Sequence, residues 1–154
     1  MSGWSGAQGG CNCGMIRYRA NAAPVTGYLC HCHLCQKRSG SAFSFQLVFP
    51  AGSVELTQGE PLRREKVQSD GGTSVSLWCP ECYSRLWMEY DRSPFATVRA
   101  GTLDDTANLR PAAQIFTSSA QSWAIEPDIL TYQEWPPSWD EMVEAGREIY
   151  AAIL

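Results

Sequence analysis

The 154-residue chain lacks several features that would place it in a common functional class. It has no basic excess, because 12 Lys and Arg residues stand against 16 Asp and Glu residues and give a net charge of −4, which argues against a nucleic-acid partner. It has no apolar run near the ~20 residues that a membrane span requires, and its Gly- and Ser-rich start lacks the basic and apolar regions of a signal peptide. We therefore predict a cytoplasmic protein without a nucleic-acid or membrane partner.

Several catalytic signatures are also missing. The chain has only two histidines, and neither a Ser/His/Asp set nor a phosphate-binding loop is evident, so we nominate no general base. No segment repeats at a fixed period, which argues against a solenoid. The length and the uniform composition indicate one domain that can bury a core without disulfide bonds. We expect a flexible N-terminus over residues 1–9 and a single zinc-binding domain over residues 10–154.

Short segments with alternating apolar and polar residues dominate the chain, and Gly, Pro, Asp or Ser separates them. This pattern predicts strands joined by turns, and hence a mainly β, antiparallel fold. Between these segments, residues 21–27 are expected to form a loop and residues 36–41 a polar or short helical turn. The predicted strands cover residues 15–19, 43–49, 54–57, 62–67, 73–79, 85–90, 97–101 and 114–117.

The C-terminal segment, residues 138–154, is predicted to be a helix. Ser138 and Glu141 have the capping-box spacing, in which the hydroxyl and the carboxylate accept hydrogen bonds from free backbone N–H groups. The apolar face of this helix packs either on the domain's own sheet or on another subunit or partner, so a homo-oligomer stays open. The residues that recur near helical spacing are Trp139, Met142, Val143, Ile149, Ile153 and Leu154.

The most informative stretch is residues 30–35, Cys-His-Cys-His-Leu-Cys, which holds three of the seven cysteines. Disulfide geometry rarely joins thiols so close in sequence, and an odd number of cysteines cannot all pair. A soft divalent ion instead gathers thiolates at about 2.3 Å in a tetrahedron. We therefore predict that Cys30, Cys32 and Cys35 bind zinc and leave its fourth position open, as in catalytic zinc sites.

An alternative is that His31 or His33 fills the fourth position and makes this site purely structural. On an extended segment, however, alternating residues face opposite sides. We therefore expect the two imidazoles to form local hydrogen bonds or to lie just outside the zinc ligands and orient them by hydrogen bonding.

The other four cysteines form two half-sites. Cys11 and Cys13 are separated by one residue, and Cys79 and Cys82 form the Cys-x-x-Cys knuckle of structural zinc sites. Brought together, they would make a closed four-thiolate site that joins the first strand to the strand ending at Cys79. A division into four and three uses every thiol. A redox role for the Cys79–Cys82 pair is the alternative, but no βαβ pattern surrounds it.

Several motifs around these cysteines carry a resemblance to a known family. They are residues 11–18 (CNCGMIRY), 30–37 (CHCHLCQK), 40–43 (GSAF), 78–82 (WCPEC), 101–105 (GTLDD), 115–116 (IF) and Trp123. In this order and spacing, they resemble the glutathione-dependent formaldehyde-activating enzymes, which are grouped with the centromere-protein-V-like proteins. The resemblance runs from about residue 10 to residue 135.

The resemblance implies a β-tent-like zinc fold with two zinc ions per chain. One ion would be structural, on the four-cysteine set, and the other catalytic, on the three cysteines of residues 30–35. It also implies carbon–sulfur lyase chemistry that joins formaldehyde to glutathione or runs in reverse.

Three residues depart from the usual pattern of this family. Tyr83 stands where glycine is common, and a side chain is disfavoured there if the backbone needs a positive φ. Gln114 replaces a histidine and Ala120 a lysine. These two changes remove an imidazole and an ammonium beside the C-terminal signature, so they bear on the reaction and not on the fold or the zinc sites.

Zinc with three thiolate ligands carries a net charge of about −1, so we expect it to acidify a bound water poorly. A thiol at the fourth position, in contrast, would lose its proton and could attack a small carbonyl. We therefore predict a zinc-dependent carbon–sulfur lyase-like enzyme with a glutathione-like thiol substrate. The alternative is a non-enzymatic zinc-stabilised scaffold or protein-interaction module. Candidate cations for substrate carboxylates are Lys37, Arg38, Arg63, Arg64, Arg85, Arg99 and Arg110.

Overall fold

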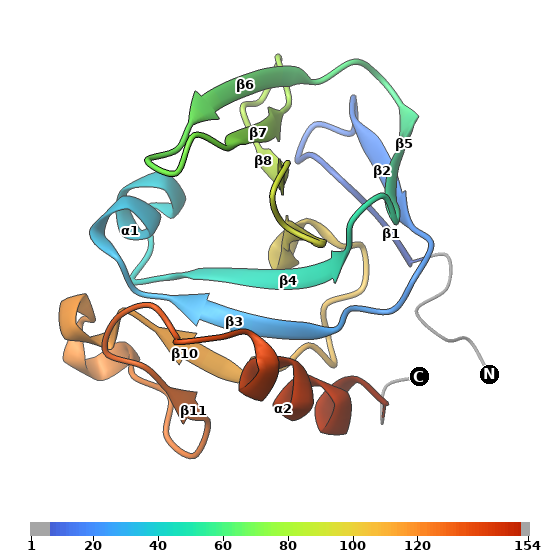
Figure 1. Cartoon of the computed structure of the whole chain (residues 1–154). Coiled ribbons are helices and arrows are strands. Elements are labelled where there is room, and N and C mark those ends of the chain that lie inside the picture. The colour runs from blue at the N-terminus through green and yellow to red at the C-terminus, as the bar shows by residue number, and fades with distance from the viewer. Residues whose placement is uncertain (1–6, 152–154) are drawn as a thin grey trace.

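The structure is a computed structural model, and it describes residues 7–151 (Figure 1). Of the N-terminal segment that was predicted to be flexible, residues 1–6 lie outside the described residues. Residues 7–9 belong to a strand, β1 (Ala7–Gly10), which pairs with β2 (Arg17–Ala20). The flexible-terminus prediction is therefore wrong for residues 7–9.

The strands form two sheets, and strand residues outnumber helical residues, so the predicted mainly β fold is confirmed. The smaller sheet has the order β1-β2-β5 and is antiparallel, with β5 at Val54–Gln58. The larger sheet has the order β11-β10-β3-β4-β9-β8-β7-β6. Its strands are β3 (Thr26–Cys30), β4 (Ser44–Pro50), β6 (Leu62–Val67), β7 (Thr73–Trp78), β8 (Arg85–Tyr90), β9 (Phe95–Arg99), β10 (Ala113–Ile115) and β11 (Leu130–Thr131).

The antiparallel prediction fails at one edge of the larger sheet, where β10 runs parallel to both β3 and β11. The reason is the long connection from β9 to β10, which contains the short 3-10 helix η1 (Ala100–Thr102). A connection of this length lets the chain return beside β3 in the same direction, whereas a tight hairpin cannot.

One face of the larger sheet packs on the smaller sheet and encloses the main core. Leu47 and Phe49 of β4 point into this core, together with Trp87 of β8. From the smaller sheet, Tyr18 contributes a fully buried ring whose centroid lies 5.4 Å from that of Trp87. The alternation of strand residues thus leaves the opposite face of the larger sheet free to line a cavity.

Two elements near residues 30–35 were not predicted from the sequence. All five residues of β3 are buried, so this strand shows no polar alternation and resembles a loop in sequence. Helix α1 (His33–Ser39) begins earlier than the predicted turn at residues 36–41, because a cysteine, Cys32, is its N-cap. The helix ends at Gly40, whose φ of 65° is a left-handed conformation that favours glycine.

The predicted C-terminal helix is present as α2 (Asp140–Ala151), and residues 152–154 lie outside the described residues. Ser138 Oγ accepts a hydrogen bond from the backbone N–H of Asp140 at 3.3 Å. This N–H is two residues on from Ser138 and not three, and the Glu141 carboxylate accepts from the Tyr132 hydroxyl, so the helix begins with a simple side-chain cap and not with the predicted capping box. No helix within residues 7–151 is long and apolar enough to cross a membrane.

Helix α2 packs on β3 of its own chain, with Met142 buried at the contact (Figure 1). The Thr26 hydroxyl donates a hydrogen bond to the Met142 carbonyl at 2.6 Å. The close approach depends on Gly146, where an added Cβ would lie 2.3 Å from the Val25 carbonyl oxygen and 2.6 Å from Thr26 Cα.

We expect Gly146→Val to destabilise the protein by about 3 kcal/mol, because the new side chain would push α2 away from the backbone of β3. Urea unfolding followed by circular dichroism measures this change. Gly101→Val is the matched control, since nothing lies within 4 Å of a Cβ at Gly101, and its effect should stay within about 0.5 kcal/mol. Equal effects of the two substitutions would contradict the packing argument.

Candidate functional site

The structure brings Cys11, Cys13, Cys79 and Cys82 together, with all four sulfur atoms within 4.8 Å of one another. The Sγ atom of Cys13 lies 3.6 Å from that of Cys11 and 3.7 Å from that of Cys79. These spacings are far longer than a disulfide bond, and they match the edge of about 3.8 Å of a tetrahedron with zinc–sulfur bonds of 2.3 Å. The cluster therefore fits a tetrahedral metal ion.

Two similar turns hold this cluster. In each turn, the backbone N–H of the first cysteine donates a hydrogen bond across the turn. The Cys11 N–H donates to the Ile16 carbonyl at 3.1 Å, and the Cys79 N–H donates to the Ser84 carbonyl at 3.0 Å. The Ile16 N–H donates to Cys11 Sγ at 3.2 Å, as amides around metal-bound thiolates commonly do. Each turn also needs one left-handed residue, which is Gly14 in the first (φ 82°) and Tyr83 in the second (φ 58°). The position of Tyr83 therefore does require a positive φ.

Ser84 joins the two turns, a role that the sequence analysis missed. Its hydroxyl oxygen accepts a hydrogen bond from the Asn12 N–H at 3.1 Å and lies 3.2 Å from Cys82 Sγ. Hydrogen bonds from the Ser84 side chain and backbone lower the pKa of Cys82 to about 5. Cys82 is thus readily ionised, which is the form that binds metal.

Cys30, Cys32 and Cys35 form a second cluster at the junction of β3 and α1. Cys30 is the last residue of β3, Cys32 caps α1, and Cys35 donates its backbone N–H to Cys32 Sγ at 3.3 Å. The neighbouring Cys30 thiol and then Ser44 lower the pKa of Cys35 to about 5, while the same contact and burial raise the pKa of Cys30. This three-thiol cluster could hold a metal ion, and no fourth ligand joins it among residues 7–151.

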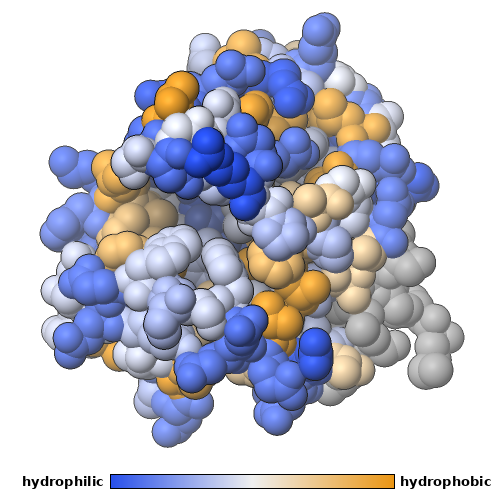
Figure 2. All heavy atoms as spheres, viewed as in Figure 1, coloured by the Kyte–Doolittle hydropathy of each residue, from blue (hydrophilic) through white to orange (hydrophobic). Residues whose placement is uncertain are grey.

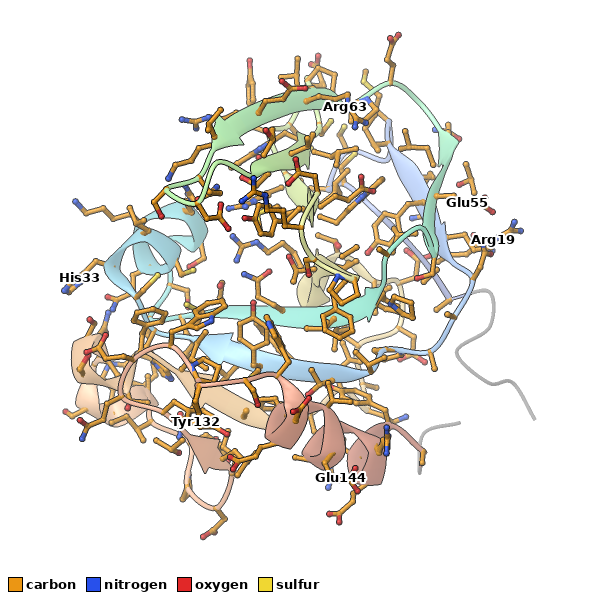
Figure 3. The ribbon with its side chains drawn as sticks, viewed as in Figure 1. Arg19, His33, Glu55, Arg63, Tyr132 and Glu144 are labelled. Atoms are coloured by element: carbon orange, nitrogen blue, oxygen red, sulfur yellow. The ribbon has the colours of Figure 1, made fainter. Side chains whose placement is uncertain are left out.

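Neither histidine approaches the three-thiol cluster closely enough to complete it. His31 is fully buried, and its Nε2 bonds with Gln114 Oε1 at 3.1 Å. Its ring also meets Phe43 edge-on, with centroids 5.6 Å apart. His33 is exposed and points outward from α1 (Figure 3). Closure of the site by a histidine therefore has no support in the described residues.

The two replaced family positions lie in different places relative to the three thiols. Gln114 pairs with Leu29 in the parallel register, so it lies on the opposite sheet face from Cys30. Its amide nitrogen donates to the Glu126 carbonyl at 2.7 Å and to the Thr131 hydroxyl at 2.9 Å, which secures β10 to β11. Ala120 lies between Ser119, whose carbonyl accepts a hydrogen bond from the Gln36 side chain of α1 at 3.0 Å, and Gln121, whose side-chain amide donates to Gln36 Oε1 at 3.3 Å. Ala120 therefore lies beside the helix that carries Cys35, whereas Gln114 lies on the sheet face away from Cys30.

A cavity of about 950 Å³ lies on the free face of the larger sheet. Cross-strand pairs place its lining residues in one row, from Thr97 of β9 to Met88, then Ser76, then Arg64 of β6. Helix α1 and the segment before α2 border it. Figure 2 shows a hollow on this side of the molecule, between strongly hydrophilic atoms above and near-neutral atoms below.

Arginines are concentrated around this cavity. A smaller cavity of about 360 Å³ shares Arg38, Trp78 and Arg85 with the larger one and also reaches Ser44 and Arg99. Of the seven candidate cations, four line one or both cavities, namely Arg38, Arg64, Arg85 and Arg99. The other three, Lys37, Arg63 and Arg110, line neither cavity, and Figure 3 shows Arg63 on the outer side of β6.

The arginines nearest the three thiols have no acidic partner, since none of the ion pairs found among residues 7–151 includes them. Arg85 lies over the Trp78 ring at 5.4 Å, and burial together with repulsion from Arg99 and Arg38 lowers its pKa to about 10. One guanidinium nitrogen of Arg99 and the hydroxyl of Thr97 are buried without any hydrogen-bond partner. Buried donors of this kind are ordinarily satisfied, so the arrangement fits an anionic ligand.

Comparison with known proteins decides the family. Residues 6–119 match the family model of the glutathione-dependent formaldehyde-activating enzymes. The chain belongs to this family. A search of curated proteins finds no match. Among solved structures, a Rhodobacter sphaeroides protein from a structural genomics programme is similar, with a TM-score of 0.52 and 11% identity over 81% of this chain and 98% of that chain. At this identity, the likeness shows the fold alone.

We expect purified protein to hold about two zinc ions per folded chain, because both clusters fit a zinc ion. Cys35→Ser should reduce the count to about one and leave the fold intact, whereas Cys82→Ser should destabilise the protein strongly, since its cluster joins distant segments. Elemental analysis and thermal unfolding measure the two effects. Equal destabilisation by the two substitutions would show that both sites are structural.

Proposed function

We propose that this protein is a zinc-dependent carbon–sulfur lyase-like enzyme that adds a glutathione-like thiol reversibly to formaldehyde or a similar small carbonyl. In this proposal, Cys30, Cys32 and Cys35 hold the catalytic zinc, and Cys11, Cys13, Cys79 and Cys82 hold a structural zinc. The observation that supports it most directly is a three-thiol cluster that no fourth ligand joins within residues 7–151, beside a cavity whose arginines take part in none of the ion pairs found among those residues.

Cys30, Cys32 and Cys35 would hold the zinc ion, which would supply the positive charge that keeps a substrate thiol deprotonated at neutral pH. In the overall reaction, a carbon–sulfur bond forms as the carbonyl π bond breaks. The thiol loses its proton to solvent, and the carbonyl oxygen gains one. A thiol with a pKa of ~8.5 is only a few per cent ionised at pH 7, so ionisation alone offers roughly ten- to thirtyfold.

The chain itself supplies the remaining effects, namely binding, positioning and the exclusion of water. Arg85 and Arg99 can hold a substrate carboxylate through charge-assisted hydrogen bonds, with the Thr97 hydroxyl as a further donor. The same apolar cluster that contains Cys30 and Cys35 keeps water away from the reacting sulfur. Placing the carbonyl next to that sulfur would provide most of any larger acceleration.

Replacing zinc with cobalt gives a spectroscopic test. Added glutathione should shift the absorption bands of the cobalt-loaded protein, since a fourth sulfur would enter the coordination sphere. The cobalt-loaded Cys35→Ser protein keeps only the four-thiolate site and should show no such shift. A four-coordinate wild-type spectrum that glutathione leaves unchanged would contradict the enzymatic proposal and favour a zinc-stabilised scaffold.

Arg99→Gln should lower kcat/KM for glutathione and formaldehyde by about tenfold or more, mainly through KM, because a buried partner of the substrate carboxylate is lost. Arg99→Lys should recover part of the loss. Arg63→Gln is the matched control, since this arginine lines neither cavity and its change should alter kcat/KM less than twofold. NMR detection of the S-hydroxymethyl adduct of glutathione measures the rates. A comparable loss in the Arg63 variant would contradict the assignment.

A further inference from the structure

Five aromatic residues form a continuous wall along one side of the larger cavity. Trp139 lies at its centre, with its ring centroid 5.7 Å from those of both Tyr28 and Phe95 and 5.9 Å from that of Trp135. Trp135 in turn lies 6.0 Å from Phe116. These residues come from β3, β9, the position just after β10 and the segment leading into α2, and all of them line the cavity. We call them the aromatic wall.

The aromatic wall is continuous with the three-thiol cluster. Cys30 and Tyr28 lie two residues apart on the same face of β3, and Leu34, between Cys32 and Cys35, also lines the cavity. Four members of the wall pack in one apolar cluster with the three cysteines. A group attached to a sulfur atom at the three-thiol cluster would therefore lie within reach of these rings.

The rest of the cavity lining is cationic and polar. Its basic residues come from α1, β6, β8 and the loop before β9, and Asp70 is the one acidic residue that lines it within the described residues. Asp70 is already engaged, because its carboxylate accepts a hydrogen bond from the Tyr90 hydroxyl. The basic residues are Arg38, Arg64, Lys66, Arg85 and Arg92. This side of the cavity suits the carboxylates of a glutathione-like thiol and leaves the aromatic wall for another part of the ligand.

Formaldehyde does not account for the aromatic wall. A one-carbon group cannot cover five rings, and the cavity of about 950 Å³ lies at the upper end of the usual range for small-molecule sites. Trp135 and Trp139 also lie beyond residue 119, where the match to the family model ends. The part of the chain that the family model does not cover therefore contributes the centre of the wall.

We propose that the aromatic wall binds the carbon part of the thiol adduct, and that this part is a flat apolar group, so the preferred carbonyl substrate is an aromatic aldehyde. This inference rests on the proposed function. The thiol sulfur bonds to the aldehyde carbon, the carbonyl π bond breaks, the oxygen gains a proton, and the thiol proton leaves to solvent. No redox partner is needed, and the aromatic ring stacks on the wall while the carboxylates meet the arginines.

Stable thioethers test this inference without turnover. S-benzylglutathione should bind the zinc-loaded protein about tenfold more tightly than S-methylglutathione, as expected if the benzyl ring contacts one or two rings of the wall. Isothermal titration calorimetry measures both affinities. In Trp135→Ala, the preference should fall to about threefold or less, while the affinity for S-methylglutathione changes less than twofold. Trp135→Phe should keep most of the preference.

Trp123→Ala is the matched control, because Trp123 is also exposed but lines neither cavity, and it should keep the full preference. Equal binding of the two thioethers to the wild-type protein, or an equal loss of preference in the Trp123 and Trp135 variants, would overturn this inference and leave the proposed function standing. Failure of glutathione and both thioethers to bind would overturn the proposed function itself. A benzyl preference that Trp135→Ala abolishes would support the inference.

Discussion

The rest of the structure depends on the gathering of seven sulfur atoms into two compact clusters. Thiolates at these separations repel one another, so each cluster requires either protons or a cation, and a divalent ion satisfies the requirement directly. Cys13 and Cys79, which are 66 residues apart in sequence, come within 3.7 Å of each other in this way. The four-cysteine cluster thereby joins the turn before β2 to the turn after β7, and the two sheets can enclose the core between them.

Sequence spacing anticipates much of this arrangement, because metal ligation depends on residue types at short, fixed separations. The grouping of the cysteines into four and three could be predicted from such spacing. Strands that bury only one face could be predicted from the alternation of apolar and polar residues along them. Strand β3 escapes this reasoning because it is buried throughout, and the parallel pairing of β10 depends on a connection whose path is not encoded locally. The sequence does not separate the cations that line a cavity from the others for a related reason, since cross-strand register decides that Arg64 faces the cavity while Arg63 does not.

The replaced family residue at position 114 illustrates how a motif can mislead about distance. In sequence, Gln114 lies beside the C-terminal signature, and the loss of an imidazole there suggests lost chemistry. In the structure, it lies on the opposite sheet face from Cys30 and fills its hydrogen-bonding capacity with His31, Glu126 and Thr131. The His31–Gln114 pair thus supports the sheet beneath the three-thiol cluster, on the face away from the cavity.

Tyr83 adds a further property to the four-cysteine cluster. A left-handed backbone at a residue with a side chain costs roughly 1–2 kcal/mol, and the exposed ring of Tyr83 offers little packing in return. Since this conformation belongs to the turn that presents Cys79 and Cys82, the strain opposes the closed, ligand-ready form of the knuckle. A glycine at this position would adopt the same backbone without that cost. The contacts among the four cysteines therefore have to offset the strain at this one residue.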